Sequence, residues 1–305
     1  SRDWSSDVCS SDLLTGVKER RWWEPGHVNA IEAAKAAKKA LAKSDVPIED
    51  IGAVIYCAVC RDNFEPATAC HVASELKVRP DTVIHDITNA CLGTMSGIID
   101  VANRIELGQI KAGLVVSCEH ARDITQILIQ RMVEEGTSEY FREAMATMTG
   151  GSGAVGILLT DGSYEQDKPR LLGGVAMGAP QHFAMCRWGA DKRIPARAPQ
   201  MMETNPIGML KHGGELIRKV GDAFFNESGW SREELDKIIS HQVAAANRDA
   251  IISNLGLTLD KDFSTFPFLG NMGTVSLPVT AAIAEERGIL EHGQKVGFIG
   301  IGSGL

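Results

Sequence analysis

The sequence lacks three features that would each indicate a different kind of protein. It has no apolar run approaching the roughly 18 residues that a membrane-spanning helix needs. Its formal charge is −8 at pH 7 with acidic and basic residues interspersed, so it has no basic excess of the kind that nucleic-acid-binding proteins show. Its seven cysteines are an odd number without the spacing of a disulfide framework, which favours a reduced cytoplasmic setting. We therefore expect a cytoplasmic enzyme with no membrane span and no nucleic-acid partner.

Both ends of the chain differ from what lies between them. Residues 1–13 are polar, rich in serine and aspartate, and without periodicity, so they have no face to bury. They resemble a translated sequencing-adapter fragment, and we expect a non-native or disordered leader. The strand-like run at 295–305 stops at the last residue. We therefore expect both ends to be truncated.

Helical and strand-like patterns alternate along the rest of the chain. Residues 28–43 have apolar positions at helical spacing, whereas 51–59 is a short apolar run typical of a strand buried on both faces. Ser231 followed by Glu234 is a capping-box pattern that predicts a helix start, and residues 171–177 are expected to form a strand. Further helices are expected at 66–76, 92–107, 210–225, 247–255 and 277–287, and further strands at 83–87, 112–118, 154–160, 237–243 and 296–301. This alternation predicts an α/β protein with mostly parallel or mixed sheets.

Two blocks of the sequence share one pattern of spacing. Cys91 is followed by a glycine after 17 residues and by another five residues later, and Asn271 is followed by glycines at the same two spacings. Both blocks have the pattern of a polar turn, a helix, a glycine turn and a strand, at an offset of 180 residues (271 − 91). We infer a duplicated α/β unit with an N-terminal half at 14–165 and a C-terminal half at 166–305. Cys91 and Asn271 then occupy equivalent strand-to-helix turns near a pseudo-twofold axis.

Cys91 is the first candidate for chemistry. It lies where the strand-like run at 83–87 gives way to the helical pattern at 92–107. A thiol at a helix N-terminus is close to unpaired backbone N–H groups and to the positive end of the helix dipole, which predicts a lowered pKa and a reactive thiolate. The alternative is a buried structural cysteine, which is the commoner role of this residue type.

Two further polar residues follow buried or glycine-rich segments. His241 comes at the end of the strand-like run 237–240, where an imidazole can project into a site. Asn271 lies between Gly270 and Met272 in a turn, and the duplication places its carboxamide opposite the thiol of Cys91. The alternatives are a histidine that bonds only to its neighbours and an asparagine that only shapes a turn.

Four motifs together resemble the ketoacyl synthase III branch of the thiolase superfamily over residues 14–305. They are Asn-Ala-Cys at 89–91, His-Gln-Val at 241–243, Gly-Asn-Met-Gly at 270–273 and Gly-Ile-Gly-Ser-Gly at 300–304. The resemblance implies a thiolase fold, in which duplicated α/β halves form layers in the order αβαβα, and a homodimer. It implies that Cys91 takes an acyl group from coenzyme A, while His241 and Asn271 hydrogen-bond the carbonyl of a second thioester. It also implies an oxyanion hole from the backbone N–H groups of Cys91 and Ser303, with no metal and with coenzyme A only as part of the substrate.

Within that branch the sequence resembles the head-to-head acyl-CoA condensing enzymes of long-chain olefin biosynthesis. The matching segments are Val-Cys-Arg-Asp-Asn-Phe-Glu-Pro-Ala-Thr beginning at 59, Asn-Ala-Cys-Leu at 89–92, the run at 270–278 and the terminal run at 300–305. The resemblance implies that Glu65 reaches across the dimer interface and takes the α-proton of the second fatty acyl-CoA, so that no malonyl decarboxylation is needed. The alternative for Glu65 is a carboxylate that only stabilises a helix start, because Pro66 follows it.

Two other activities stay open at this point. One is ordinary 3-oxoacyl synthase III activity, with malonyl-acyl-carrier protein as the second substrate. The other is an inactive, truncated fragment that only binds acyl chains or dimerises. Arg187 and Trp188, together with Lys192, Arg193 and Arg197, form a local basic patch. The patch is a candidate for docking coenzyme A phosphates or an acidic carrier protein, and a solvated loop face is the alternative.

Overall fold

The computed structural model of the chain describes residues 15–165, 167–190 and 200–305. Within them, the larger sheet has the strand order β2-β1-β3-β4. Its strands are β1 (Ile51–Cys57), β2 (Val83–Ile87), β3 (Ala112–Glu119) and β4 (Gly153–Thr160). The first three are parallel, and β4 runs antiparallel to β3. The predicted strands at 51–59, 83–87, 112–118 and 154–160 are confirmed to within a few residues.

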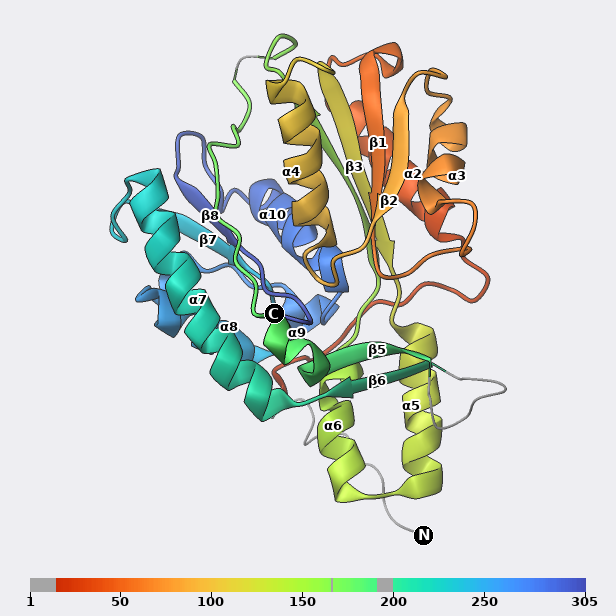
Figure 1. The fold of residues 1–305 in the computed structure, drawn as a ribbon, viewed down its shortest axis with the longest axis vertical. Coiled ribbons are helices and arrows are strands. Elements are labelled where there is room, and N and C mark those ends of the chain that lie inside the picture. The colour runs from red at the N-terminus through yellow and green to blue at the C-terminus, as the bar shows by residue number, and fades with distance from the viewer. Residues whose placement is uncertain (1–14, 166, 191–199) are drawn as a thin grey trace.

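Helices cover both faces of this sheet (Figure 1). They are α2 (Asn29–Leu41), α3 (Thr68–Leu76) and α4 (Gly93–Glu106). Alternate residues of β1 point to opposite sides: Val54 and Tyr56 pack with α2 and α3, whereas Ala53, Ile55 and Cys57 pack with α4. Because β1 is buried on both faces, its sequence is a continuous apolar run rather than an alternating one.

The C-terminal half repeats this arrangement on a smaller scale. A parallel pair, β7 (Lys237–Ser240) and β8 (Val296–Ile299), lies between α7 (Pro206–Ser228) with α8 (Ala245–Leu255) on one face and α10 (Ser276–Glu286) on the other. Ile238 packs toward α7 and α8, and its neighbour Ile239 packs toward α10. The layers therefore run α2/α3, sheet, α4/α10, sheet, α7/α8, and the predicted αβαβα order is confirmed (Figure 1).

Two hairpins complete the described part of the chain. The helices α5 (Arg122–Glu135) and α6 (Ser138–Met148) pack against a β-hairpin of β5 (Cys186–Ala190) and β6 (Gln200–Thr204). The remaining elements are the short helix α9 (Phe266–Leu269) and the 3₁₀ turns η1 (Ile48–Asp50), η2 (Pro180–Met185), η3 (Leu259–Lys261) and η4 (Gly273–Val275). Figure 1 shows both hairpins below the larger sheet, on the side where α4 begins.

The two halves meet through a pair of threonines. The backbone N–H of Thr94 donates to Oγ1 of Thr274 at 2.7 Å, and Oγ1 of Thr94 donates to the carbonyl oxygen of Thr274 at 2.8 Å. These residues are 180 positions apart, which is the offset between the two sequence blocks. Residues at equivalent places in two halves touch each other only where a twofold axis passes between them. The contact therefore supports the inferred duplication, although the boundary at 165 and 166 stays a prediction.

Two local expectations are wrong. Residues 171–177 form no strand, and Leu171 and Leu172 are exposed, so this apolar run has no strand partner in the described structure. Ser231 and Glu234 make the reciprocal bonds of a capping box, at 2.8 and 3.3 Å, but only a turn follows them. The reason is that β7 begins at Lys237, so pairing with β8 leaves too few residues for a helix.

Candidate active site

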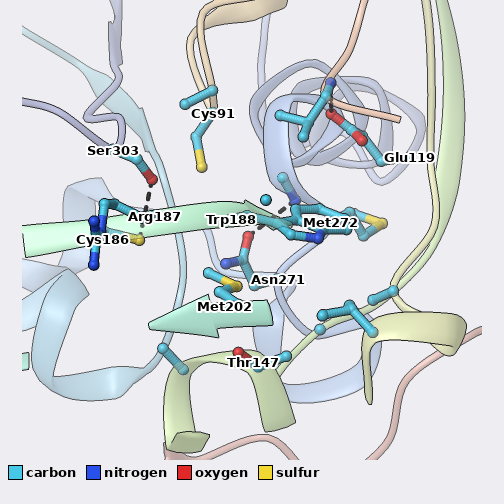
Figure 2. Close-up of a pocket in the computed structure, with 18 of the residues that line it drawn as sticks. Cys91, Glu119, Thr147, Cys186, Arg187, Trp188, Met202, Asn271, Met272 and Ser303 are labelled. Carbon is cyan, nitrogen blue, oxygen red and sulfur yellow. Dashed lines mark hydrogen bonds between the residues drawn. The ribbon is translucent and has the colours of Figure 1, made fainter. Parts of the chain in front are cut away.

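A cavity of about 750 Å³ lies where the two halves meet the β5–β6 hairpin. The N-terminal half contributes Cys91 and Glu119 to its wall, and the C-terminal half contributes Asn271 and Ser303. The hairpin contributes further lining residues, which are Cys186, Arg187, Trp188, Gly189, Met202 and Glu203. Figure 2 shows the sulfur of Cys91 pointing into the cavity, above the carboxamide of Asn271. The structure therefore brings together two of the residues that the repeat places at equivalent turns.

Cys91 lies in a tight corner between β2 and α4. Ala90 has a left-handed backbone with φ +44°, and the corner is closed by a hydrogen bond of 2.9 Å from the N–H of Leu92 to the carbonyl of Asn89. The helix α4 begins at Gly93, two residues after the thiol. This geometry directs the side chain of Cys91 out of the sheet and into the cavity.

The expected lowering of the Cys91 pKa is wrong. Burial raises the pKa of the Cys91 thiol to about 12, and the nearby Cys186 and Glu119 raise it further, whereas a backbone hydrogen bond lowers it by less. Loss of hydration therefore outweighs the helix N-terminus, because a thiolate in an apolar site loses more from desolvation than it gains from a few N–H groups. With this pKa the Cys91 thiol keeps its proton at neutral pH.

Backbone hydrogen bonds to neighbouring segments fix the position of Asn271. Its N–H donates to the carbonyl of Thr149 and its carbonyl accepts from the N–H of Gly151, both at 2.8 Å. Its side-chain Oδ1 accepts from the N–H of Gly273 at 3.0 Å. The oxygen of the carboxamide is therefore engaged in the turn, and the NH₂ group is the part that can donate to a substrate carbonyl.

His241 follows β7 and is 2% exposed. Its backbone N–H donates to the carbonyl of Ile299 at 2.8 Å, while Nδ1 of its ring has no hydrogen-bond partner among the described residues. Burial lowers its pKa to about 4, so the imidazole is neutral at pH 7. His241 is not among the described residues that line the cavity, so the structure does not place it beside Cys91 and Asn271 there.

Ser303 and two residues of the predicted basic patch lie on the cavity wall. The Ser303 hydroxyl donates to Sγ of Cys186 at 3.2 Å on the cavity wall. Arg187 lines the cavity and forms an ion pair with Glu203, with 2.7 Å between Nη2 and Oε2. Trp188 also lines the cavity. The remaining residues of the predicted patch, all outside the described ranges, are Lys192, Arg193 and Arg197.

Glu65 lies on the loop between β1 and α3 and is exposed. It is not among the described residues that line the cavity, and its neighbour Phe64 is fully exposed at 101%. The loop itself is anchored, because the carboxylate of Asp62 accepts the backbone N–H groups of Asn29 and Ala30 at 2.8 and 2.9 Å. Within one chain, Glu65 is therefore presented outward on a fixed loop.

Sequence reasoning missed Glu119, the last residue of β3. It is 4% exposed, it lines the cavity, and burial raises the pKa of its carboxyl group. The signal was present in the sequence, because an acidic residue ends the otherwise apolar or small-residue run of β3. Buried carboxylates at strand ends are uncommon unless they are hydrogen-bonded, so the position was a candidate site residue.

Among the described residues, neither a metal site nor a membrane-spanning helix is found. No group of three or more histidine, cysteine, aspartate or glutamate side chains is placed to hold a metal ion. No helix in the described ranges combines the length and the apolar character needed to cross a membrane.

Two α/β halves in five layers, with a cysteine and an asparagine meeting from equivalent turns, define a thiolase-fold protein. The profile of the thiolase N-terminal domain matches residues 29–168, and that of the 3-oxoacyl-[acyl-carrier-protein] synthase III C-terminal domain matches residues 225–305. The chain is 50% identical to the acyl-CoA:acyl-CoA alkyltransferase of Shewanella oneidensis over 96% of this chain and 84% of that protein. The chain belongs to the acyl-CoA:acyl-CoA alkyltransferase family of the thiolase superfamily.

More distant relatives are consistent with this assignment. The acyl-CoA:acyl-CoA alkyltransferase of Xanthomonas campestris is 33% identical over 96% of this chain and 84% of that protein. The structure of Xanthomonas campestris OleA with bound lauric acid and lauroyl-CoA matches with a TM-score of 0.90 and 32% identity, covering 96% of this chain and 85% of that one. The β-ketoacyl-[acyl-carrier-protein] synthase III of Bacillus pumilus is 28% identical over 95% of this chain and 85% of that protein.

Proposed function

We propose that this protein joins two fatty acyl-CoA molecules by a non-decarboxylative Claisen condensation and releases a β-keto product. The observation that carries the proposal is the convergence of Cys91 and Asn271, from opposite halves of the chain, on one cavity of about 750 Å³. The names of the relatives at 50% and 33% identity support acyl-CoA as both substrates.

In the first half-reaction, the sulfur of Cys91 attacks the carbonyl carbon of the first acyl-CoA. The bond from that carbon to the coenzyme A sulfur breaks, and the thiol proton leaves with coenzyme A. We assign the oxyanion hole to the backbone N–H groups of Cys91 and Ser303, since both residues line the cavity. Donors aimed at a developing oxyanion are worth roughly 3–4 kcal/mol each in comparable acyl-transfer sites. Because the pKa of Cys91 is about 12, the thiol must lose its proton as it attacks.

In the second half-reaction, a base takes the α-proton of the second acyl-CoA and the resulting enolate attacks the acyl group on Cys91. The bond between that acyl carbon and Sγ of Cys91 then breaks, the proton taken by the base returns to the Cys91 sulfur, and the product is a β-ketoacyl-CoA. We assign enolate stabilisation to Asn271, which lines the cavity, and, from the family motif that it matches, to His241, which lies outside the lining; both are neutral hydrogen-bond donors. Neutral donation by His241 agrees with its pKa of about 4. Arg187 and Trp188 line the same cavity and are assigned to substrate contact.

We assign the base to Glu65 of a second copy of the chain in a homodimer. Its outward position on a loop fixed by Asp62, beside the fully exposed Phe64, is the arrangement expected of a residue that serves a neighbouring subunit. A carboxylate that is desolvated when the neighbour covers it becomes a stronger base toward a C–H bond. The cytoplasm remains the expected location, and an acyl-carrier protein remains the alternative carrier of either acyl group.

The decisive experiment uses one defined fatty acyl-CoA with the purified protein. Intact-mass spectrometry reports the acyl adduct on Cys91. Product mass spectrometry reports the β-ketoacyl-CoA, the β-keto acid formed when water hydrolyses its thioester, and the ketone left when that acid loses CO2. A product formed without malonyl thioester supports the proposal, whereas a strict malonyl requirement would overturn it in favour of ordinary synthase III activity. Absence of any adduct on native protein would support the inactive fragment.

Two variants test the assigned roles. Cys91→Ala should abolish acyl loading. Glu65→Ala should leave loading intact and slow condensation by about 10²–10⁴-fold, the usual contribution of a general base. Glu75→Ala is the matched control, because Glu75 is an exposed carboxylate on α3 that pairs with Lys38 at 3.7 Å. An unchanged condensation rate in Glu65→Ala would remove Glu65 as the base.

A further inference from the structure

We propose that Glu119 is a positioning residue for the condensation step, because its carboxylate holds together the loop that carries Glu65 and the turn that carries Asn271. The inference rests on the proposed function. Glu119 ends β3, and Figure 2 shows it on the opposite side of the cavity from Ser303.

The first set of contacts fixes the Glu65 loop. Oε1 of Glu119 accepts the backbone N–H of Val59 at 2.9 Å, and Oε2 accepts that of Cys60 at 3.1 Å. These two residues follow β1, which ends at Cys57, and they begin the loop that reaches Glu65 five residues after Cys60. The carboxylates of Glu119 and Asp62 together thus determine where this loop leaves the sheet.

The second set of contacts fixes the Asn271 turn. The turn that carries Asn271 packs against the Glu119 side chain at Gly273. The backbone of Gly273 lies so close that a Cβ there would be 3.4 Å from Cγ, Cδ and Oε1 of Glu119. The N–H of Gly273 is in turn the donor to Oδ1 of Asn271. The carboxylate and the carboxamide are therefore linked through one turn.

These contacts favour a positioning role over a catalytic one. Each oxygen of Glu119 already accepts a backbone N–H. Burial raises the pKa of the carboxyl group, but these hydrogen bonds lower it, which makes the carboxylate a weaker base toward a substrate proton than burial alone would. Only a carboxylate can accept from all of these donors at once. A glutamine would place an NH₂ group against at least one backbone N–H, and that anchor would be lost.

The charge of Glu119 supplies an independent readout. It is one of the groups that raise the pKa of the Cys91 thiol, after burial and Cys186. Removing the charge should make Cys91 react with iodoacetamide at lower pH than in the wild type. This shift reports the charge of Glu119 beside Cys91, whereas the ratio of condensation to loading reports its positioning role.

The experiment compares Glu119→Gln and Glu119→Asp with the surface control Glu75→Gln. Acyl loading of Cys91 is followed by intact mass, and the condensation rate is expressed per loaded site, so that misfolded molecules do not count. We expect Glu119→Gln to load within about threefold of the wild type and to condense about 10–100-fold more slowly, because small displacements of reacting groups cost factors of this size. Its alkylation profile should shift to lower pH. Glu119→Asp, which keeps the charge with a shorter reach, should keep the wild-type profile and condense at an intermediate rate.

Two outcomes would overturn the inference. One is a condensation rate per loaded site that is unchanged in Glu119→Gln. The other is an equal loss of loading and condensation, which would indicate a general structural role. If Glu119→Gln does not fold, the condensation rate per loaded site is measured in Glu119→Asp instead. A rate equal to that of the wild type in Glu119→Asp would also overturn the inference. If the wild type itself forms no product from a single acyl-CoA, the proposed function has failed instead.

Discussion

The buried imidazole of His241 predicts a specific loss of stability in acid. Its pKa is lowered from 6.5 to about 4 in the folded protein by burial. Because the folded pKa is below the unfolded one, His241 contributes stability that is present above pH 6.5 and is lost as the pH falls toward 4. At about 1.4 kcal/mol per pH unit, the full contribution is about 3 kcal/mol, and about 2 kcal/mol of it is lost between pH 7.5 and pH 5.

The perturbation is His241→Asn, which removes the titrating group. Urea unfolding at pH 7.5 and pH 5, followed by tryptophan fluorescence, gives the free energy of unfolding for each protein. The variant should lose about 2 kcal/mol less than the wild type between these pH values. Glu119 and Asp262, whose pKa values burial raises, act in the opposite direction, but their effects cancel in the difference. His292→Asn, at an exposed position, should match the wild type. Equal losses in wild type and His241→Asn would refute the reasoning.

Two further predictions concern packing. Thr94→Val and Thr274→Val should each lower the free energy of unfolding by about 1–3 kcal/mol, because each leaves a buried partner unpaired across the contact between the halves. In urea titrations the double variant should cost less than the sum of the two, and strict additivity would contradict a direct coupling. Gly156→Ala should cost about 1–3 kcal/mol or more, because its Cβ would lie 2.7 Å from the backbone of α2. Gly174→Ala meets nothing within 4 Å and should melt like the wild type, so equal effects would argue against that close approach.

The sequence predicts the alternating helices and strands and the meeting of Cys91 with Asn271 because both depend on patterns that repeat along the chain. The order of the layers came from the resemblance to the thiolase superfamily. Buried strands such as β1 have continuous apolar sequence, and a shared spacing of glycines fixes which turns are equivalent. Local signals fail where a neighbour distant in sequence decides the outcome. The capping box at Ser231 forms its hydrogen bonds, yet strand pairing at Lys237 ends the turn before a helix can grow.

The chemical properties of the site residues were harder to predict from the sequence than their positions. The direction of the Cys91 pKa depends on how completely the thiol is buried, which the preceding and following residues do not reveal. Glu119 becomes significant only when the ends of β1 and β3 lie side by side and the Asn271 turn packs against them. The outward direction of Glu65 likewise depends on the anchoring of its loop by Asp62 to a helix some 30 residues earlier in the chain.

The left-handed backbone of Ala90 has a consequence for how the nucleophile is aimed. A residue with a Cβ pays about 1–2 kcal/mol in this region of φ and ψ, and glycine does not. Because the methyl group disfavours this conformation, the contacts around the corner must hold it, among them the hydrogen bond from the N–H of Leu92 to the carbonyl of Asn89. The orientation of the sulfur is thus encoded one position upstream of the cysteine, and a redesign of which thioesters it accepts would begin with the main chain at position 90.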